Sequence, residues 1–347
     1  MRKYMMNTID CNSDCVLAED IFVCNTKLIS RYTPINDYIK QSLFSKGINE
    51  VSVYKKNDSK DISSNSEADE FKEGYEIAVS DVKKFVLNIC DGNSLDYDEL
   101  LNLSEKVYDN IGKCDYMVKY AREIKNNDEY TFYHSVNVAF YGMLIANWLK
   151  LTDNEIREVI SAGILHDLGK IKIENEILNK PGKLTNSEYE KIKEHPVYGY
   201  EMINNDSRIS NKVKLAILQH HERINGTGYP YGIKADEIDL YSKIIAVADV
   251  YDAMTSDRVY KKKKSPFIAF KMFRTEGISL FDASILRTFM SNITVHFIGA
   301  KVILNDGREG KIVYIPPDNI LHPILKVDSN YVDFSKDSDS YISEVIM

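Results

Sequence analysis

The sequence lacks an apolar run long enough to cross a membrane. A membrane helix needs about 20 consecutive apolar residues, and no stretch of the 347 residues comes close to that length. The cationic Arg2 and Lys3 are followed by the polar Asn7, Thr8 and Asp10, where a secretion signal would carry its apolar segment. We therefore expect a protein that stays in the cytoplasm and does not enter the membrane.

Cysteine is scarce, with five residues in the whole chain. An odd number in a long chain of this kind predicts free thiols and not a disulfide framework. A zinc or redox site near the N-terminus would need a CxxC pair and a fourth ligand, and the three cysteines there have neither. The five residues are Cys11, Cys15, Cys24, Cys90 and Cys114.

A positive excess of charge is also missing. The net charge is -8, with 44% hydrophobic and 28% charged residues, which is typical of a globular protein. The chain as a whole should therefore not attract DNA or RNA, and a phosphate-containing ligand would need local cations or metal ions. The length allows one large domain and one or two small ones.

The first 56 residues predict a small accessory domain with both helix and strand. A helical pattern around residues 38–44 ends at Gly47, and residues 48–54 then alternate as a strand does. Residues 57–70 are rich in Ser, Asn and Asp, which is typical of a polar linker. No motif in this part indicates a function.

Helical spacing of apolar residues follows from Phe71 to about Phe289. We expect connecting helices over residues 71–127 and a helical catalytic domain over residues 128–293. Helix starts are predicted at Asp153 or Asn154 and at Asn186 or Ser187, the latter with a Ser187–Glu190 capping box.

After Thr294 the spacing of apolar residues changes from the helical period to the alternation of β-strands. Residues 301–304 and 311–315 are strand-like and flank the glycine-containing segment 305–310, which predicts a β-hairpin. Residues 294–347 should form a small β appendage. The fold class is therefore mainly α, with a helical bundle, an N-terminal α+β unit and a C-terminal β-hairpin appendage.

The seven histidines are strongly clustered, since five fall within the 88 residues from His134 to His221. A single histidine on an apolar helix is usually a structural residue, but five in one helical domain indicate a shared metal centre. Helices from distant parts of the chain can point such side chains into one bundle core. The five are His134, His166, His195, His220 and His221.

Two aspartates complete this candidate centre. Asp167 follows His166 directly and could bridge two ions, while Asp249 lies among Val and Ala on an apolar helix face. An unpaired charge at such a position is expensive to bury, so Asp249 needs a partner. Imidazoles combined with carboxylates suit first-row divalent metals that catalyse hydrolysis.

Several segments match motifs of one family in the correct order. The chain resembles the HD-GYP family of the HD phosphohydrolase superfamily over roughly residues 125–300. The matching segments are His134 with its neighbours, HDLGK at 166–170, HPVYG at 195–199, HHERINGTGYP at 220–230 and ADVYDAMTSDRVY at 248–260.

The resemblance implies an HD-type helical bundle with two metal ions, iron or manganese, bridged by Asp167. One ion would be held by His134, His166 and Asp249, and the other by His195, His220 and His221. Some family members hold a third ion through a carboxylate one helical turn before the first histidine. Tyr130 occupies that place here and Glu129 is one residue away, which favours two ions.

The resemblance further implies hydrolysis of cyclic di-GMP to pGpG, with GMP as a further product, by a hydroxide that bridges the two metals. Lys170 matches the family's catalytic lysine, which stabilises a phosphoryl oxygen or assists the leaving group. Positive φ angles at Gly226 and Gly228 would let the backbone approach a ligand. The substrate contacts implied are Gly228, Tyr229, Pro230, Arg258 and Lys261.

Two alternatives stay open at this point. The chain could be a receptor that binds a cyclic dinucleotide without cleaving it, or an HD phosphohydrolase that acts on another nucleotide. The exact dinucleotide and the oligomeric state are also open, and a homodimer is one option.

Overall fold

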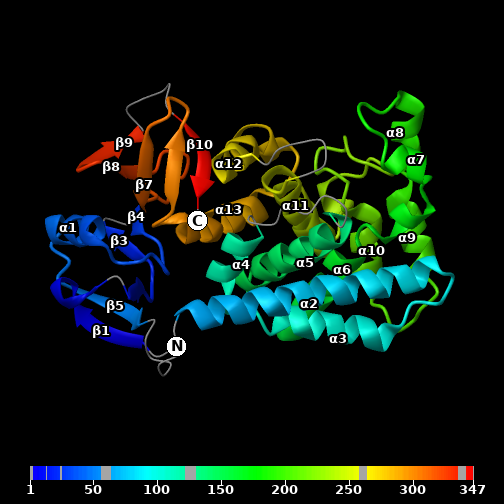
Figure 1. Ribbon diagram of the computed structural model, residues 1–347, viewed down its shortest axis with the longest axis horizontal. Coiled ribbons are helices and arrows are strands. Elements are labelled where there is room, and N and C mark those ends of the chain that lie inside the picture. The colour runs from blue at the N-terminus through cyan, green and yellow to red at the C-terminus, as the bar shows by residue number, and fades with distance from the viewer. Residues whose placement is uncertain are drawn as a thin grey trace. The chain divides into compact units, whose positions relative to one another are not determined.

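The computed structural model describes residues 3–12, 14–23, 26–55, 64–121, 130–257, 264–334 and 341–346. It contains two compact units (Figure 1). Unit 1 comprises Met1–Glu67, Lys264–Lys271 and Phe289–Met347, and unit 2 comprises Ala68–Lys263 and Met272–Thr288. No helix among the described residues is long and apolar enough to cross a membrane.

Unit 1 is built from antiparallel sheets, one complete α-helix near the N-terminus, and the helical residues 266–271 and 289–293. A three-stranded sheet has the order β1-β5-β2, a five-stranded sheet has the order β10-β6-β7-β8-β9, and β3 pairs with β4. The helix α1 is Asp37–Ser45. The strands are β1 (Lys3–Asn7), β2 (Cys15–Leu17), β3 (Ile21–Val23), β4 (Thr26–Ile29), β5 (Glu50–Lys55), β6 (Lys301–Leu304), β7 (Glu309–Tyr314), β8 (Ile324–Val327), β9 (Asn330–Asp333) and β10 (Ile342–Ile346).

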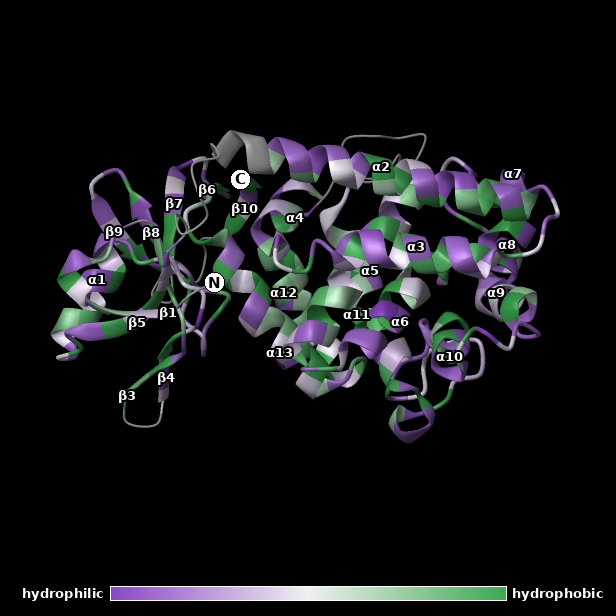
Figure 2. Cartoon of the chain, turned by 90° about the horizontal axis from the view of Figure 1, so that it is seen from below, coloured by the Kyte–Doolittle hydropathy of each residue, from purple (hydrophilic) through white to green (hydrophobic). Residues whose placement is uncertain are grey.

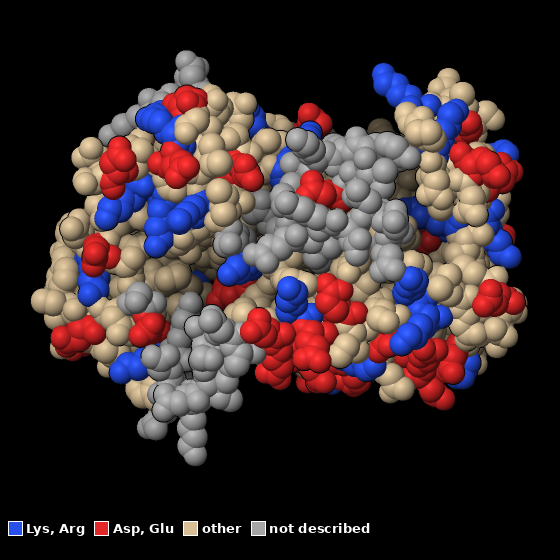
Figure 3. Space-filling model, viewed as in Figure 1, with Lys and Arg blue, Asp and Glu red and all other residues tan. Residues whose placement is uncertain are grey.

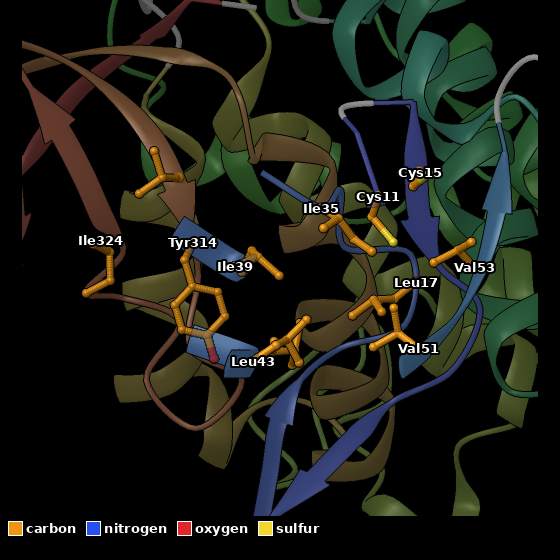
Figure 4. Packing of buried hydrophobic residues seen from close by; sticks show 12 residues of the cluster. Cys11, Cys15, Leu17, Ile35, Ile39, Leu43, Val51, Val53, Tyr314 and Ile324 are labelled. Carbon is orange, nitrogen blue, oxygen red and sulfur yellow. The ribbon is translucent and has the colours of Figure 1, made fainter. Parts of the chain in front are cut away.

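The two ends of the chain share the core of unit 1. Ile39 and Leu43 of α1 belong to one buried apolar cluster with Tyr314 and Ile324 of the C-terminal sheet (Figure 4). The side-chain amide of Asn36, the residue that caps α1, donates to the Val313 carbonyl at 2.8 Å. The N-terminal segment and the C-terminal sheet therefore form one body. The domain boundaries expected from the sequence stay a prediction.

The local predictions for unit 1 are confirmed, and the C-terminal sheet is larger than the predicted hairpin. α1 ends before Gly47, which has a φ of +73°, and β5 follows it. β6 and β7 form the expected hairpin, but they are inner strands of a five-stranded sheet. The described cysteines, Cys11, Cys15, Cys90 and Cys114, are free thiols, and Cys24 lies outside the described residues.

Unit 2 is helical, which confirms a mainly α fold. Its central helix is α5, in which every residue from Tyr133 to Ala146 is buried. α6 and α11 pack against α5, α10 packs against α11, and α9 packs against α10. The helices from α2 onward are α2 (Ser64–Cys90), α3 (Tyr97–Tyr108), α4 (Cys114–Tyr120), α5 (Tyr130–Trp148), α6 (Asp153–Leu165), α7 (Asn175–Leu178), α8 (Asn186–Ile192), α9 (His195–Ile203), α10 (Asn211–Gln219), α11 (Leu240–Thr255), α12 (Pro266–Thr275) and α13 (Ala283–Ile293).

The long helix α2 covers unit 2 with one buried face. Its buried residues recur at intervals of three or four, from Phe71 and Tyr75 to Val82, Phe85 and Ile89. Polar and apolar residues are accordingly interspersed along α2 and α3 (Figure 2). Acidic side chains gather along these two helices on the face seen in Figure 3. This surface does not favour polyanions, as the net charge already indicated.

Three local predictions were displaced. α2 begins at Ser64, inside the predicted linker, because residues 67–70 are helix-compatible Glu, Ala and Asp. The caps are Thr152 and Thr185, each with a capping box to a glutamate three residues on. The helical residues after Thr185 form two helices, α8 and α9, and α9 has Pro196 in its first turn.

Two motif glycines allow the segment with Asp167 to approach α9. This segment continues as a short 3₁₀ helix, η3 (Leu168–Lys172), that packs on α9. A Cβ on Gly169 would lie 1.9 Å from the His195 carbonyl oxygen and 2.4 Å from the Gly199 nitrogen. Only a residue without a side chain fits there, so Gly169 sets the distance between Asp167 and His195.

We expect Gly169→Ala to destabilise the protein by about 2–3 kcal/mol or more, because rigid backbone atoms would have to move. Urea unfolding followed by circular dichroism measures this change. Gly74→Ala in α2 is the matched control, since a Cβ at Gly74 meets nothing within 4 Å. The control should be neutral or slightly stabilising. Equal stabilities of the two variants would contradict the close packing at Gly169.

Candidate metal centre

The seven residues expected to bind metal come together inside unit 2. Most come from helix ends: His166 caps the C-terminus of α6, His195 begins α9, and His220 caps the C-terminus of α10. His134 lies in the first half of α5 and Asp249 in α11. Six of the seven are buried, namely His134, His166, Asp167, His195, His220 and Asp249, and His221 is partly exposed.

Asp167 faces two separate groups of imidazoles. Its Oδ2 lies 3.3 Å from His166 Nε2 and 3.7 Å from His134 Nε2, whereas its Oδ1 lies 3.3 Å from His195 Nε2. Two sets of ligand atoms result, each with all atoms within 4.8 Å of one another. They are His134–His166–Asp167 and Asp167–His195–His220–His221.

Asp249 lies beside the same groups. Its Oδ1 is 3.1 Å from His134 Nε2, and its Oδ2 is 4.0 Å from His221 Nδ1. It therefore has the buried partner that the sequence argument required. Asp249 contacts residues of both sets, whereas the resemblance implied only the set with His134 and His166.

The protons of four imidazoles are fixed on the side away from the centre. Nδ1 of His166, His195 and His220 lies 2.7–2.8 Å from the carbonyl oxygen of the residue three positions earlier. Nδ1 of His134 lies 2.6 Å from Asp252 Oδ2. A carbonyl or carboxylate oxygen accepts, so each Nδ1 must donate a proton. In the neutral imidazole, Nε2 then carries a lone pair.

Among the described residues, the Nε2 lone pairs of His166, His195 and His220 lack a proton donor, whereas His134 Nε2 lies 3.1 Å from Asp249 Oδ1. The Nε2 atoms of His195 and His220 are 3.2 Å apart, and neither carries a proton when its ring is neutral. His166 Nε2 is buried and makes no hydrogen bond within the described part of the chain. Facing lone pairs repel unless a cation lies between them. With two carboxylates alongside, this set of nitrogen and oxygen donors fits a divalent metal ion.

The pKa shifts of His220, His221 and Asp167 agree with this donor set, whereas the pKa shift of His134 favours a protonated ring in the absence of a metal ion. Burial lowers the pKa of His220 and of His221 well below the usual histidine value, which favours the neutral form that binds metals. Burial alone would raise the pKa of Asp167, but His166 and Lys170 outweigh it and hold the pKa well below the usual value. Burial would lower the pKa of His134, but hydrogen bonds with Asp249 and Asp252 raise it to about 9.

Lys170 lies at the edge of the centre. Its Nζ is 2.5 Å from Asp167 Oδ2, and its side chain is 26% exposed compared with 4% for Asp167. The ammonium group is therefore positioned between the buried carboxylate and solvent. A cation that only neutralises a helix terminus would not need this contact with the centre.

The loop after His221 folds back on the metal ligands. Tyr229 stacks on the His221 ring, with centroids 4.5 Å apart, and the Tyr229–Pro230 peptide bond is cis. Gly226 has the expected positive φ, +81°, but Gly228 does not. Gly228 is needed for space instead, since a Cβ there would lie 2.4 Å from Glu222 Cα.

Sequence reasoning missed two buried acids around the centre. Glu222 Oε1 accepts hydrogen bonds from the backbone of Tyr231 and Gly232, which fixes the loop that contains Tyr229. Asp252 orients His134, as described above. Both lie inside the matched motifs, and this membership was the sequence signal that could have identified them.

Some predicted residues cannot be placed. Arg258, Lys261 and Glu129 lie outside the described residues. Tyr130, at the place where a third metal ion would need a carboxylate, stacks on His134 with centroids 5.6 Å apart.

Comparison with known proteins finds relatives of the part of the chain that contains these residues. Residues 119–285 match the HD domain family. A cyclic di-GMP phosphodiesterase of Pseudomonas aeruginosa is 41% identical over 204 residues, which are 59% of this chain and 49% of that protein. A cyclic di-GMP phosphodiesterase response regulator of Xanthomonas campestris is 39% identical, covering 47% of this chain and 43% of that protein.

A further relative is a 3'3'-cGAMP-specific phosphodiesterase of Vibrio cholerae, 37% identical over 41% of this chain and 31% of that protein. The chain spans less than half the length of each of these three curated relatives.

A solved structure supports the fold. A protein of Bdellovibrio bacteriovorus described as an HDG"Y"P protein superposes with a TM-score of 0.53 at 14% identity, covering 83% of this chain and 98% of that one. At this identity the likeness concerns the fold alone. Residues 119–285 of this chain are thus similar to the HD domain family, and its fold is similar to that of the HDG"Y"P protein.

Proposed function

We propose that this chain is a metal-dependent phosphodiesterase that hydrolyses cyclic di-GMP to pGpG, with GMP as a further product. One observation carries the proposal: the two oxygens of the Asp167 carboxylate face two different histidine groups. A carboxylate between two ligand sets is the arrangement that two metal ions share in enzymes that cleave phosphate esters.

The ligands divide as follows in this proposal. His134, His166 and Asp249 hold one ion, His195, His220 and His221 hold the other, and Asp167 bridges them. The mixture of imidazole and carboxylate suits iron or manganese. Two ions are favoured over three because the Tyr130 ring packs against His134.

The bound ions would lower the pKa of a water molecule, so that hydroxide is available to attack phosphorus near neutral pH. They would also supply positive charge for the phosphoryl oxygens. In the reaction the water oxygen bonds to phosphorus, the bond from phosphorus to the ribose 3′ oxygen breaks, and that oxygen takes up a proton. Asp167 and the histidines hold the centre rigid. We assign Lys170 to a phosphoryl oxygen or to the leaving oxygen, because its ammonium group lies at the edge of the centre.

Charge balance supports a substrate with phosphodiester groups. Two divalent cations and Lys170 would carry five positive charges, and the buried carboxylates of Asp167, Asp249 and Asp252 remove three. The remaining positive charge attracts phosphate in a surrounding with little solvent, even though the protein has a net charge of -8.

The relatives guide the choice of dinucleotide. Two of those compared are named for cyclic di-GMP and one for 3'3'-cGAMP, so both cyclic dinucleotides are to be tested. We propose Gly228, Tyr229 and Pro230 as substrate contacts, because the loop that holds them stacks on His221. Arg258 and Lys261 stay predictions, as do the cytoplasmic location and the homodimer.

We expect Asp167→Ala to lower the rate of cyclic di-GMP hydrolysis about a thousandfold or more, because the bridge between the two ligand sets is lost. The assay is anaerobic incubation of the purified chain with Fe²⁺ or Mn²⁺, with products separated by chromatography. Asp236→Ala is the matched control, because Asp236 is an exposed carboxylate in the same unit.

The same assay separates the rival functions. Equal hydrolysis by wild type and Asp167→Ala would contradict the proposed mechanism. Binding of cyclic di-GMP without turnover by the metal-loaded wild type would favour a receptor. Cleavage of mononucleotides only would indicate another HD phosphohydrolase.

We also expect metal removal to lower the stability of unit 2, since the ions bind only the folded arrangement. Mn²⁺ at about 100 times its dissociation constant would stabilise the fold by about 2.7 kcal/mol, or roughly 5–10 °C in the melting temperature. Differential scanning calorimetry of chelator-treated and Mn²⁺-reloaded protein measures the shift. Asp167→Ala should lose most of this shift, and an equally large shift in that variant would contradict the assigned centre.

A further inference from the structure

Asp252 is a buried carboxylate in α11 to which the reaction assigns no role. It is 0% exposed, and both its oxygens are used. Oδ2 accepts from His134 Nδ1 at 2.6 Å, and Oδ1 accepts from Asn137 Nδ2 at 2.8 Å and from Ser256 Oγ at 2.7 Å. Asp252 therefore fixes the plane of the His134 ring and keeps its proton on Nδ1.

The chain of hydrogen bonds continues to α2. The hydroxyl of Tyr75 donates to Asn137 Oδ1 at 2.5 Å. Because the Asn137 amide donates to a carboxylate at one end and accepts from a hydroxyl at the other, only one orientation of this amide satisfies both bonds. Tyr75 is buried, and its ring stacks on Phe140 at 5.8 Å. The path runs from Tyr75 through Asn137 and Asp252 to His134.

His134 is supported differently from the other histidines. His166, His195 and His220 donate to carbonyls of Gly163, Ile192 and Ile217, which lie in the last turns of α6, α8 and α10. The carbonyls of a last helical turn lack an intrahelical partner and are available.

His134 lies inside α5, where the nearby carbonyls are used by the helix itself. Its orientation therefore depends on side chains from other helices.

We propose that Tyr75, Asn137 and Asp252 form a positioning relay through which α2 sets the metal affinity of the His134–His166–Asp167 set. This inference rests on the proposed function in taking that set as a metal site. Tyr75 lies outside residues 119–285, the part that matches the HD domain family. The relay thus adds a residue from outside the matched domain to the support of one metal ligand.

The neighbouring residue fixes the same turn of α2. Glu76 accepts from the hydroxyls of Tyr120 and Tyr133, both at 2.7 Å, and Tyr133 directly precedes His134. Tyr75 and Glu76 therefore tie α2 to both α4 and α5. This anchoring holds the Tyr75 hydroxyl at a constant distance from Asn137, which a relay of three hydrogen bonds requires.

Tyr75→Phe removes one hydroxyl and keeps the aromatic packing. We expect it to weaken Mn²⁺ binding at one of the two sites by about tenfold, the lower end of the effect of residues that support metal ligands. Free Mn²⁺ is followed by electron paramagnetic resonance while metal-free protein is titrated. Tyr241→Phe is the matched control, because buried Tyr241 donates its hydroxyl to Glu158 at 2.8 Å and lies outside the relay.

A second variant tests whether the residues act as one path. Asn137→Ala should weaken the same site, and the Tyr75→Phe/Asn137→Ala double variant should bind Mn²⁺ no more weakly than Asn137→Ala alone. Near-ultraviolet circular dichroism checks folding. If Asn137→Ala does not fold, the comparison of Tyr75→Phe with Tyr241→Phe decides. At saturating Mn²⁺ the Tyr75→Phe variant should regain the wild-type kcat and KM, because its defect is in metal affinity.

The outcomes separate this inference from the proposed function. Mn²⁺ affinity of Tyr75→Phe equal to that of wild type would overturn the relay and leave the phosphodiesterase proposal intact. Failure of wild type to bind Mn²⁺, Fe²⁺ or Zn²⁺ would overturn both. Weakened Mn²⁺ binding in Tyr75→Phe, combined with no cleavage of any cyclic dinucleotide by wild type, would support the relay and overturn the phosphodiesterase.

Discussion

The burial of unpaired imidazole nitrogens and carboxylates in the helical bundle is the constraint on which unit 2 depends. Lone pairs and negative charge in an apolar core cost free energy unless cations or hydrogen bonds compensate them. At His195 and His220 the Nδ1 hydrogen bonds force the Nε2 lone pairs toward each other at 3.2 Å. A cation at the centre would remove this repulsion.

Close backbone contact makes this convergence sterically feasible. A Cβ on Gly163 would lie 2.5 Å from Ala139 Cα, where α6 meets α5. Gly169 meets the backbone of α9, and Gly228 meets the residues after His221. Each of these glycines lies within a few residues of a metal ligand or of the loop that covers one. These motif glycines are needed because they allow two backbone segments to lie close together. Of Gly226 and Gly228, for which the sequence predicted a positive φ, only Gly226 has one.

The sequence predicted the cluster of histidines and aspartates better than it predicted the side chains that orient this cluster by hydrogen bonds. Clustering of rare histidines identified five of the seven residues that the structure brings together, and Asp167 and Asp249 were added from their sequence neighbours. Sequence reasoning selected Asp249 and assigned no role to Asp252, although both are carboxylates on one face of an apolar helix. Their difference depends on tertiary neighbours, with His134 Nε2 near Asp249 and Nδ1 near Asp252. Tyr75 was equally hidden, since helical spacing marks it as buried but does not name its partner.

The position of each histidine in its helix determines whether nearby residues in the sequence can orient its ring. A histidine at a helix C-terminus can donate to the free carbonyl three residues earlier. His166 and His220 are therefore oriented by hydrogen bonds within their own segments. A histidine within a helix has no free carbonyl at that position, so its Nδ1 must donate to a side chain of another element. His134 is of this second kind, and its support consequently comes from α11, α5 and α2. The orientation of His134 therefore depends on side chains from several helices, whereas those of His166 and His220 depend on single helix ends.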